Sequence, residues 1–118
     1  MNTPVYDFLI QYAERDPVRL HMPGHKGRFG APALQRATTL DLTEITGADS
    51  LFEAEGILAE SERNAASLYG TAYTFYSCGG STLCIQTMLL LMKQQGRAVL
   101  AARNVHRAFL NPCVLLAL

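Results

Sequence analysis

The chain has 118 residues, of which ten are basic, ten acidic and 49% hydrophobic, so we expect one folded domain rather than a disordered chain. The balanced charge argues against nucleic acid or an anionic membrane as a partner. Three cysteines without CxxC spacing predict neither a disulfide framework nor a metal site, and no leader or bilayer-spanning stretch stands out, so we expect a cytoplasmic protein.

The first predicted element is a helix that opens at Thr3 and Pro4. A capping hydroxyl there precedes a proline at the first helical position. Apolar side chains follow at helical spacing, at Val5, Phe8, Leu9, Tyr12 and Ala13. The pattern predicts an amphipathic helix that ends at Asp16-Pro17, because the residue before a proline disfavours the helical region.

Residues 21–27 read HMPGHKG and follow no helical or strand period. His21 and His25 would be paired metal ligands on a helix, but Pro23-Gly24 breaks any helix between them. The glycine spacing fits neither the P-loop nor the dinucleotide motif. We therefore expect a rigid loop that presents cationic or hydrogen-bonding groups, in preference to a plain surface turn.

An acidic window with no lysine or arginine covers residues 41–62. It contains Asp41, Glu44, Asp49, Glu53, Glu55, Glu60 and Glu62. We interpret it as a solvated acidic face, with residues 40–56 as a mostly irregular connection. Residues 57–69 then show helical spacing, and Gly70 is placed to end that helix.

The stretch from 72 to 95 carries the clearest binding signal. Residues 72–76 predict a strand, and residues 83–95 a helix, with the turn 77–82 between them. A glycine-containing turn at a helix start leaves backbone N–H groups free for a phosphate. Ser81 and Thr82 could add hydroxyl donors there, or they could simply cap the helix.

The rest of the chain predicts a second strand over 98–101 and a last apolar helix within 105–118 that Pro112 would kink or end. A strand, a helix and another strand in this order imply parallel pairing. We therefore expect an α/β fold with the binding turn at the carboxyl end of a strand.

Four segments carry a resemblance to a known family: HMPGHKG at 21–27, DLTEITG at 41–47, GST at 80–82 and RNVH at 103–106. In order and spacing they resemble the start of the major domain of the bacterial ornithine/lysine/arginine decarboxylases. These are pyridoxal-phosphate enzymes of fold type I, the aspartate aminotransferase fold. The resemblance divides the chain into a helix-and-loop segment, 1–38, and the start of the cofactor-binding major domain, 39–118, with an incomplete sheet.

The resemblance implies that Gly80, Ser81 and Thr82 hold the phosphate of pyridoxal 5'-phosphate, and that His106 stacks on its ring. From the residues alone, a helix-capping or partly buried structural histidine is the favoured interpretation of His106. His25 and Lys26 would lie in a loop near the active-site region, without an assigned role. The chain departs from the family pattern at Gly79, where asparagine is usual, and at Arg107-Ala108, where Lys-Ser is usual.

The activity implied is decarboxylation of lysine, ornithine or arginine to a diamine or agmatine, in a protein that forms a homodimer or a larger assembly. Lys26 and Lys93 are the only lysines, and neither stands where the family has its Schiff-base lysine. We therefore expect a fragment that is inactive alone. The alternatives are a non-catalytic remnant that binds a partner through an open sheet edge, or another fold type I enzyme such as an aminotransferase.

Overall fold

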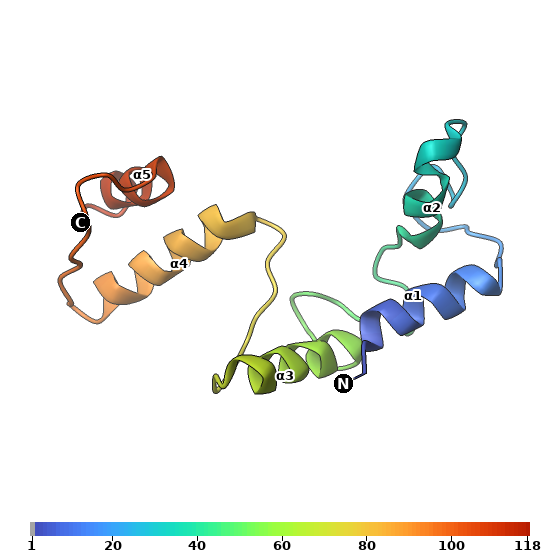
Figure 1. Cartoon of the computed structure of the whole chain (residues 1–118), viewed down its shortest axis with the longest axis horizontal. Helices are drawn as coiled ribbons and strands as arrows, with labels where there is room; N and C mark the ends of the chain where they lie inside the picture. Colours follow the sequence, from blue (N-terminus) through green and yellow to red (C-terminus); the bar gives the residue numbers. More distant parts are fainter. Residues whose placement is uncertain (1) are drawn as a thin grey trace. The chain divides into compact units, whose positions relative to one another are not determined.

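The computed structural model describes residues 2–118, and every regular element in this range is a helix (Figure 1). The helices are α1 (Pro4–Glu14), α2 (Pro32–Leu40), α3 (Ile57–Tyr69), α4 (Gly80–Gln94) and α5 (Arg107–Leu115). No helix in the described range is both long and apolar enough to cross a membrane.

The predicted α/β fold with an incomplete sheet is wrong for this structure. Residues 72–76 and 98–101, the two expected strands, have irregular backbone. A helix satisfies its hydrogen bonds within its own segment, whereas a strand needs a partner, and a two-stranded pair is marginal in water. The apolar side chains of these segments are accordingly left in solvent: Tyr73 is 78% exposed, and Leu100 is fully exposed.

The chain separates into two compact units, Met1–Tyr76 and Ser77–Leu118. Helices α1, α2 and α3 belong to the first, and α4 and α5 to the second. The predicted boundary between residues 38 and 39 stays a prediction, and the two units are described separately below.

In the first unit, α1 packs against both α2 and α3. The Thr3 N–H and hydroxyl donate to the Asp7 carboxylate, which lies in the first turn of α1, as a negative charge near a helix start should. Gly70 ends α3 in the left-handed conformation, with φ of 65°. The predicted limits of both helices are thereby confirmed at Pro4 and at Gly70.

Helix α3 lacks a capping side chain at Gly56, and Asp49 takes over that role from the preceding loop. Its carboxylate accepts hydrogen bonds from Gly56 N (2.8 Å) and Leu58 N (2.9 Å), and from the amides of Ser50 and Glu55. Desolvation acts to raise the pKa of Asp49, but these four backbone donors together lower it from 3.8 to about 2. The acidic window is therefore more than a solvated face.

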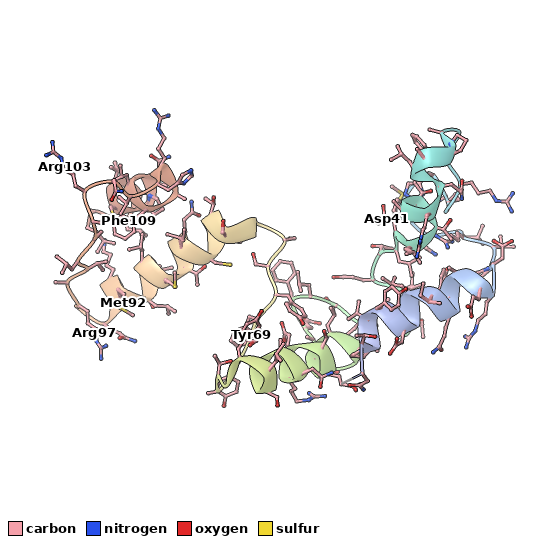
Figure 2. The ribbon with its side chains drawn as sticks, viewed as in Figure 1. Asp41, Tyr69, Met92, Arg97, Arg103 and Phe109 are labelled. Atoms are coloured by element: carbon pink, nitrogen blue, oxygen red, sulfur yellow. The ribbon has the colours of Figure 1, made fainter. Side chains whose placement is uncertain are left out.

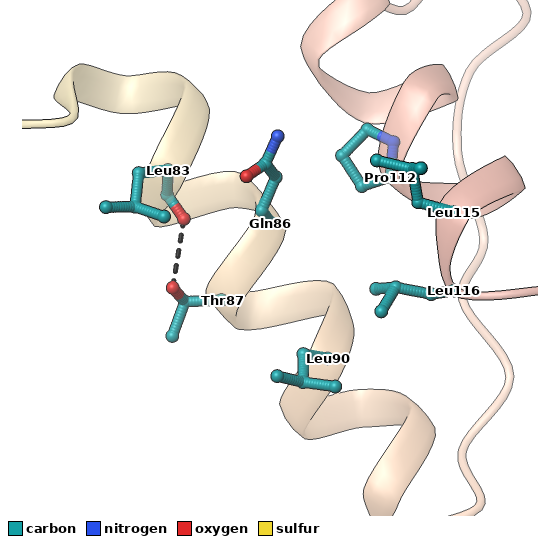
Figure 3. A pocket seen from close by; sticks show the side chains of 7 residues that line it. All are labelled: Leu83, Gln86, Thr87, Leu90, Pro112, Leu115 and Leu116. Atoms are coloured by element: carbon teal, nitrogen blue, oxygen red, sulfur yellow. Dashed lines mark hydrogen bonds between the residues drawn. The ribbon is translucent and has the colours of Figure 1, made fainter.

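In the second unit, α4 and α5 pack against each other, and a mainly apolar groove lies between them (Figure 3). The residues that line it are Leu83, Gln86, Thr87 and Leu90 from α4 and Pro112, Leu115 and Leu116 from α5 and its end. Pro112 lies inside α5 and is buried, and the helix continues to Leu115. Helix α4 begins at Gly80, three residues before the predicted start at 83, so residues 80–82 of the predicted turn lie in its first turn.

Candidate functional site

The first turn of α4 presents unpaired hydrogen-bond donors. Among residues 2–118, no acceptor bonds to the amides of Gly80, Ser81 and Thr82, and the residue that precedes the helix, Gly79, has no side chain with which to cap it. Ser81 and Thr82 are exposed, and their hydroxyls make no hydrogen bond in this range. The capping alternative for these two hydroxyls is therefore not seen.

Gly80 shapes this turn. Its φ of 65° is one that side chains with a Cβ rarely adopt, and a Cβ placed there would meet no atom within 4 Å. The space beside its backbone is thus open. Because no acidic residue stands in the first turn of α4, the positive end of the helix dipole is not neutralised. Free amides, free hydroxyls and this open space together fit a phosphate dianion.

Gly79 is one of the departures from the family pattern, and the side chain of Leu83 packs closely against it. A Cβ at residue 79 would lie 2.6 Å from Cδ2 and 2.7 Å from Cβ of Leu83. Gly79 N–H also donates to Ser77 Oγ (3.2 Å), which closes the turn in front of α4. The structure therefore leaves no room here for the asparagine that the resemblance leads one to expect.

His106 stands immediately before α5 and caps it. Its Nδ1 accepts a hydrogen bond from Ala108 N at 3.1 Å, and the residue as a whole is exposed. Because Nδ1 is occupied, the ring face and Nε2 are the parts of His106 that could meet a ligand. The structure thus shows the capping role, and ring stacking stays a prediction.

Both lysines donate hydrogen bonds to backbone carbonyl oxygens. Lys26 lies in the first unit and donates to the carbonyl oxygen of His21 (2.5 Å). Lys93 donates to the carbonyl oxygen of Leu116 near the C-terminal end of α4. Twelve helical residues separate Lys93 from Ser81, which corresponds to about 18 Å along the axis.

The polar side chains of the HMPGHKG loop bond mostly within the first unit. Tyr12 Oη donates to His21 Nε2 (2.7 Å), and His21 Nδ1 donates to the Met22 carbonyl. His25 Nδ1 accepts from Gly27 N (3.0 Å), which leaves its proton on Nε2, directed at Asp41 Oδ2 (3.1 Å). In Figure 2, Asp41 is labelled beside α2, whose C-terminal end it follows. These bonds join the loop to Tyr12 and Asp41, and its rigidity stays a prediction.

Arg19, two residues before this loop, was not predicted from the sequence pattern. It is 8% exposed, and its guanidinium donates to the carbonyl oxygens of Thr38, Thr39 and Asp41 at the end of α2. The available signal was an alternation in which Val18, Leu20 and Met22 are exposed while Arg19 and His21 turn inward. Apolar residues normally take the inner face of such an alternation, so the period alone pointed the wrong way.

Asp49 was also missed as an individual residue. The signal for it was the sequence Glu55-Gly56 before α3, where no side chain suited to capping stands at the helix start.

No group of three or more histidine, cysteine, aspartate or glutamate residues in the described range could hold a metal ion.

A comparison with protein-family models matches residues 3–117 to "Orn/Lys/Arg decarboxylase, major domain". Among curated proteins, the chain is 34% identical to the uncharacterized protein YaaO of Bacillus subtilis over 92% of its length. It is 32% identical to an arginine decarboxylase of Halalkalibacterium halodurans over 95%. The lysine decarboxylase LdcA of Pseudomonas aeruginosa is 24% identical over 95% of the chain.

These alignments cover only a part of each relative. The chain corresponds to 24% of the Bacillus and Halalkalibacterium proteins and to 16% of the Pseudomonas enzyme. No solved structure gives a significant match.

Proposed function

Because this chain belongs to the Orn/Lys/Arg decarboxylase major-domain family, we propose that it forms the cofactor-phosphate end of a pyridoxal-phosphate-dependent decarboxylase of basic amino acids. The observation that carries the proposal is the uncapped first turn of α4, with its free amides and free hydroxyls at residues 80–82. The family match includes this turn. The chain spans about a quarter of the length of the first curated relatives that it matches.

In this proposal the amides of Gly80, Ser81 and Thr82 and the two hydroxyls hold the phosphate. The N-terminal end of the helix dipole supplies positive potential. When bound, pyridoxal phosphate supplies an electron-accepting ring for the loss of carbon dioxide from an amino acid. His106 would lie against that ring by its face, because its Nδ1 is held by the Ala108 amide.

We further propose that the chain does not turn over substrate by itself. Decarboxylation in this family uses a lysine bound covalently to the cofactor. Lys26 and Lys93 are each bonded to a carbonyl oxygen, and Lys93 lies at the opposite end of α4 from the phosphate turn. Lysine, ornithine and arginine all remain possible substrates of the whole protein. Assembly as a homodimer or larger, in the cytoplasm, is part of the same proposal.

The phosphate site is tested by titrating the chain with pyridoxal phosphate and, separately, with inorganic phosphate, followed by ³¹P NMR. The Ser81→Ala/Thr82→Ala variant should bind both ligands at least about tenfold more weakly, since two hydroxyl donors to a charged group are lost. Thr87→Val is the matched control, because its hydroxyl is bonded within α4 to the Leu83 carbonyl (3.0 Å; Figure 3). Equal affinity in the wild type and the double variant would reject the site.

Inactivity is tested separately by incubation with pyridoxal phosphate and borohydride, followed by peptide mapping and a decarboxylation assay with all three amino acids. We expect at most scattered, substoichiometric labelling and no release of carbon dioxide. A stoichiometric adduct at one lysine together with turnover would defeat this part of the proposal and leave the phosphate site standing.

The rival interpretations are less well supported. Among residues 2–118 there is no strand, so binding of a partner through an open sheet edge has no structural basis. The family match over 3–117 also favours a decarboxylase over an aminotransferase.

A further inference from the structure

A buried charge without a carboxylate partner lies beneath the HMPGHKG loop. Arg19 is the one charged side chain that is buried within residues 2–118, and no salt bridge in this range includes it. Removing a guanidinium from water is costly unless its donors are satisfied. The groups around Arg19 must therefore satisfy the hydrogen-bond donors of its guanidinium.

Backbone carbonyls and an aromatic ring satisfy the guanidinium. Nη2 donates to the Thr39 carbonyl at 2.6 Å, and Nη1 lies 3.5 Å from the carbonyl oxygens of Thr38 and Asp41. These oxygens form the C-terminal end of α2, the negative end of its dipole. Arg19 Cζ also lies 5.2 Å from the centre of the Tyr12 ring, within the range of a cation–π contact. Arg19 thus ties α1 to the end of α2.

The loop rests on the same guanidinium. A Cβ at Gly27 would lie 2.6 Å from Arg19 Cζ and 2.6 Å from Nη1, so only a glycine can approach this closely. Gly27 is buried and has a φ of 76°, which by itself favours glycine. The position of the Gly27 backbone is therefore set by its packing on Arg19.

The Gly27 backbone in turn determines the state of His25. Its N–H occupies Nδ1 of His25, so the neutral ring carries its proton on Nε2, which faces the Asp41 carboxylate at 3.1 Å. The chain of contacts runs from Arg19 through Gly27 and His25 to Asp41. Its two ends meet, because Arg19 also bonds the Asp41 carbonyl.

We infer that Arg19 is the positioning residue of the HMPGHKG loop: it holds Gly27 in place and, through the Gly27 amide, fixes His25 as the Nε2–H tautomer facing Asp41. The relevance of this loop to decarboxylation rests on the proposed function. The contacts that join Arg19, Gly27 and His25 are observed in the structure and do not depend on that proposal. If Arg19 served only to cap α2, its replacement would weaken that helix and leave the His25 tautomer unchanged.

The test is ¹⁵N NMR of histidine side chains in the full 118-residue chain at about pH 8, where an ordinary imidazole is neutral. In the wild type, His25 should show protonated Nε2 and unprotonated Nδ1. Arg19→Met and Arg19→Lys should both shift His25 to a mixture of tautomers, because neither residue reproduces the planar, several-donor guanidinium. Arg36→Met is the matched control, as Arg36 is an exposed arginine on α2.

The amide signals of Gly56 and Leu58, which Asp49 caps, report whether each variant is folded. A folded Arg19→Met or Arg19→Lys variant that keeps the pure Nε2–H tautomer overturns the inference. If the tautomer changes equally in Arg36→Met, the effect is not specific to Arg19, and the inference is likewise rejected.

If both Arg19 variants are mostly unfolded in buffer, a double-mutant cycle is measured in trimethylamine N-oxide, which favours the folded state and makes their folding equilibrium constants measurable. Gly27→Ala should lower the folding equilibrium constant at least about threefold more in the wild-type background than in Arg19→Ala, where the guanidinium no longer opposes the new Cβ. Additive effects would overturn the inference. Phosphate titration of the wild type is a separate measurement, since residues 80–82 take no part in the contacts of Arg19. A failure of the proposed function therefore shows in the wild-type titration alone.

Discussion

Tyr12 Oη lies 2.7 Å from Nε2 of His21, and this bond joins α1 to the first residue of the HMPGHKG loop. The other nitrogen of the same ring donates to the Met22 carbonyl, so Nε2 is the acceptor when the ring is neutral. The Tyr12 ring also lies under Arg19 and 6.1 Å from the Phe8 ring. One tyrosine therefore contributes both a hydroxyl and a ring surface to the packing of the loop.

Tyr12→Phe separates these two contributions. The ring contacts remain, and loss of a partly buried hydrogen bond should lower the free energy of unfolding by about 1 kcal/mol in urea denaturation at pH 8. Tyr6→Phe is the control, because Tyr6 also lies on α1, is 53% exposed and makes no side-chain hydrogen bond within residues 2–118. Equal effects of the two substitutions would contradict the role assigned to the Tyr12 hydroxyl.

Asp49→Asn should destabilise the first unit in a pH-dependent way. The pKa of Asp49 is about 2 in the folded chain and 3.8 ordinarily, so the unfolded chain takes up the proton first as the pH falls. The stabilisation is therefore complete above about pH 4 and is lost as the pH falls through about 2. Urea unfolding of wild type and variant should differ most at neutral pH and converge near pH 2.

Glu53→Gln is the control for this experiment. Glu53 lies in the same acidic window, is exposed and makes no hydrogen bond in the described range. A pH profile in which Glu53→Gln follows Asp49→Asn would mean that general charge in the window, rather than capping of α3, underlies the effect.

Gly79→Ala should destabilise the second unit by about 1–3 kcal/mol, the usual cost of overpacking. The new Cβ would meet the Leu83 side chain at its own Cβ, which cannot rotate away. Gly24→Ala is the matched control, since a Cβ there meets no atom within 4 Å and its φ is not in the left-handed region. Circular dichroism during thermal unfolding measures both, and a neutral Gly79→Ala would refute the close contact.

His106 offers a way to separate capping from cofactor contact. His106→Ala should lower stability by about 1 kcal/mol, whereas His106→Asn should retain it, because asparagine caps helices well. If His106 also lies against the cofactor ring, both variants should bind pyridoxal phosphate more weakly and inorganic phosphate unchanged. Calorimetric titration with the two ligands distinguishes these outcomes. If His106→Asn keeps its affinity for pyridoxal phosphate, His106 caps α5 and does not contact the cofactor ring.

The sequence predicted the helices well where their ends carry chemical signals. Pro4 and Gly70 fixed two helix limits because proline at the first position and a left-handed glycine have local causes. Helix α2 was missed, since Pro32 opens it but apolar spacing within it is weak. The strands at 72–76 and 98–101 were wrong because strand formation depends on a partner, which local pattern does not specify.

In the candidate site and its surroundings, too, features with local causes were predicted and features that depend on distant contacts were not. The start of α4 was predicted to within three residues, because a glycine-containing turn before an apolar helix is a local signal. Arg19 and Asp49 were not, because each acts on backbone groups distant in sequence: Arg19 on Thr39, and Asp49 on Leu58. A pattern analysis that weighs side chains by type assigns such residues to the surface.

The second unit buries few side chains, among them Leu89, Ala108 and Pro112, and it is close to the size of ~40 residues below which chains seldom fold unaided. A ligand that binds only the folded form adds to its stability, by about 2.7 kcal/mol at a hundredfold excess over Kd. Under the proposed function, phosphate at the start of α4 would therefore act as a folding ligand. Folding of the second unit would then be coupled to binding of the cofactor, as folding of a small metal-binding domain is coupled to binding of its ion.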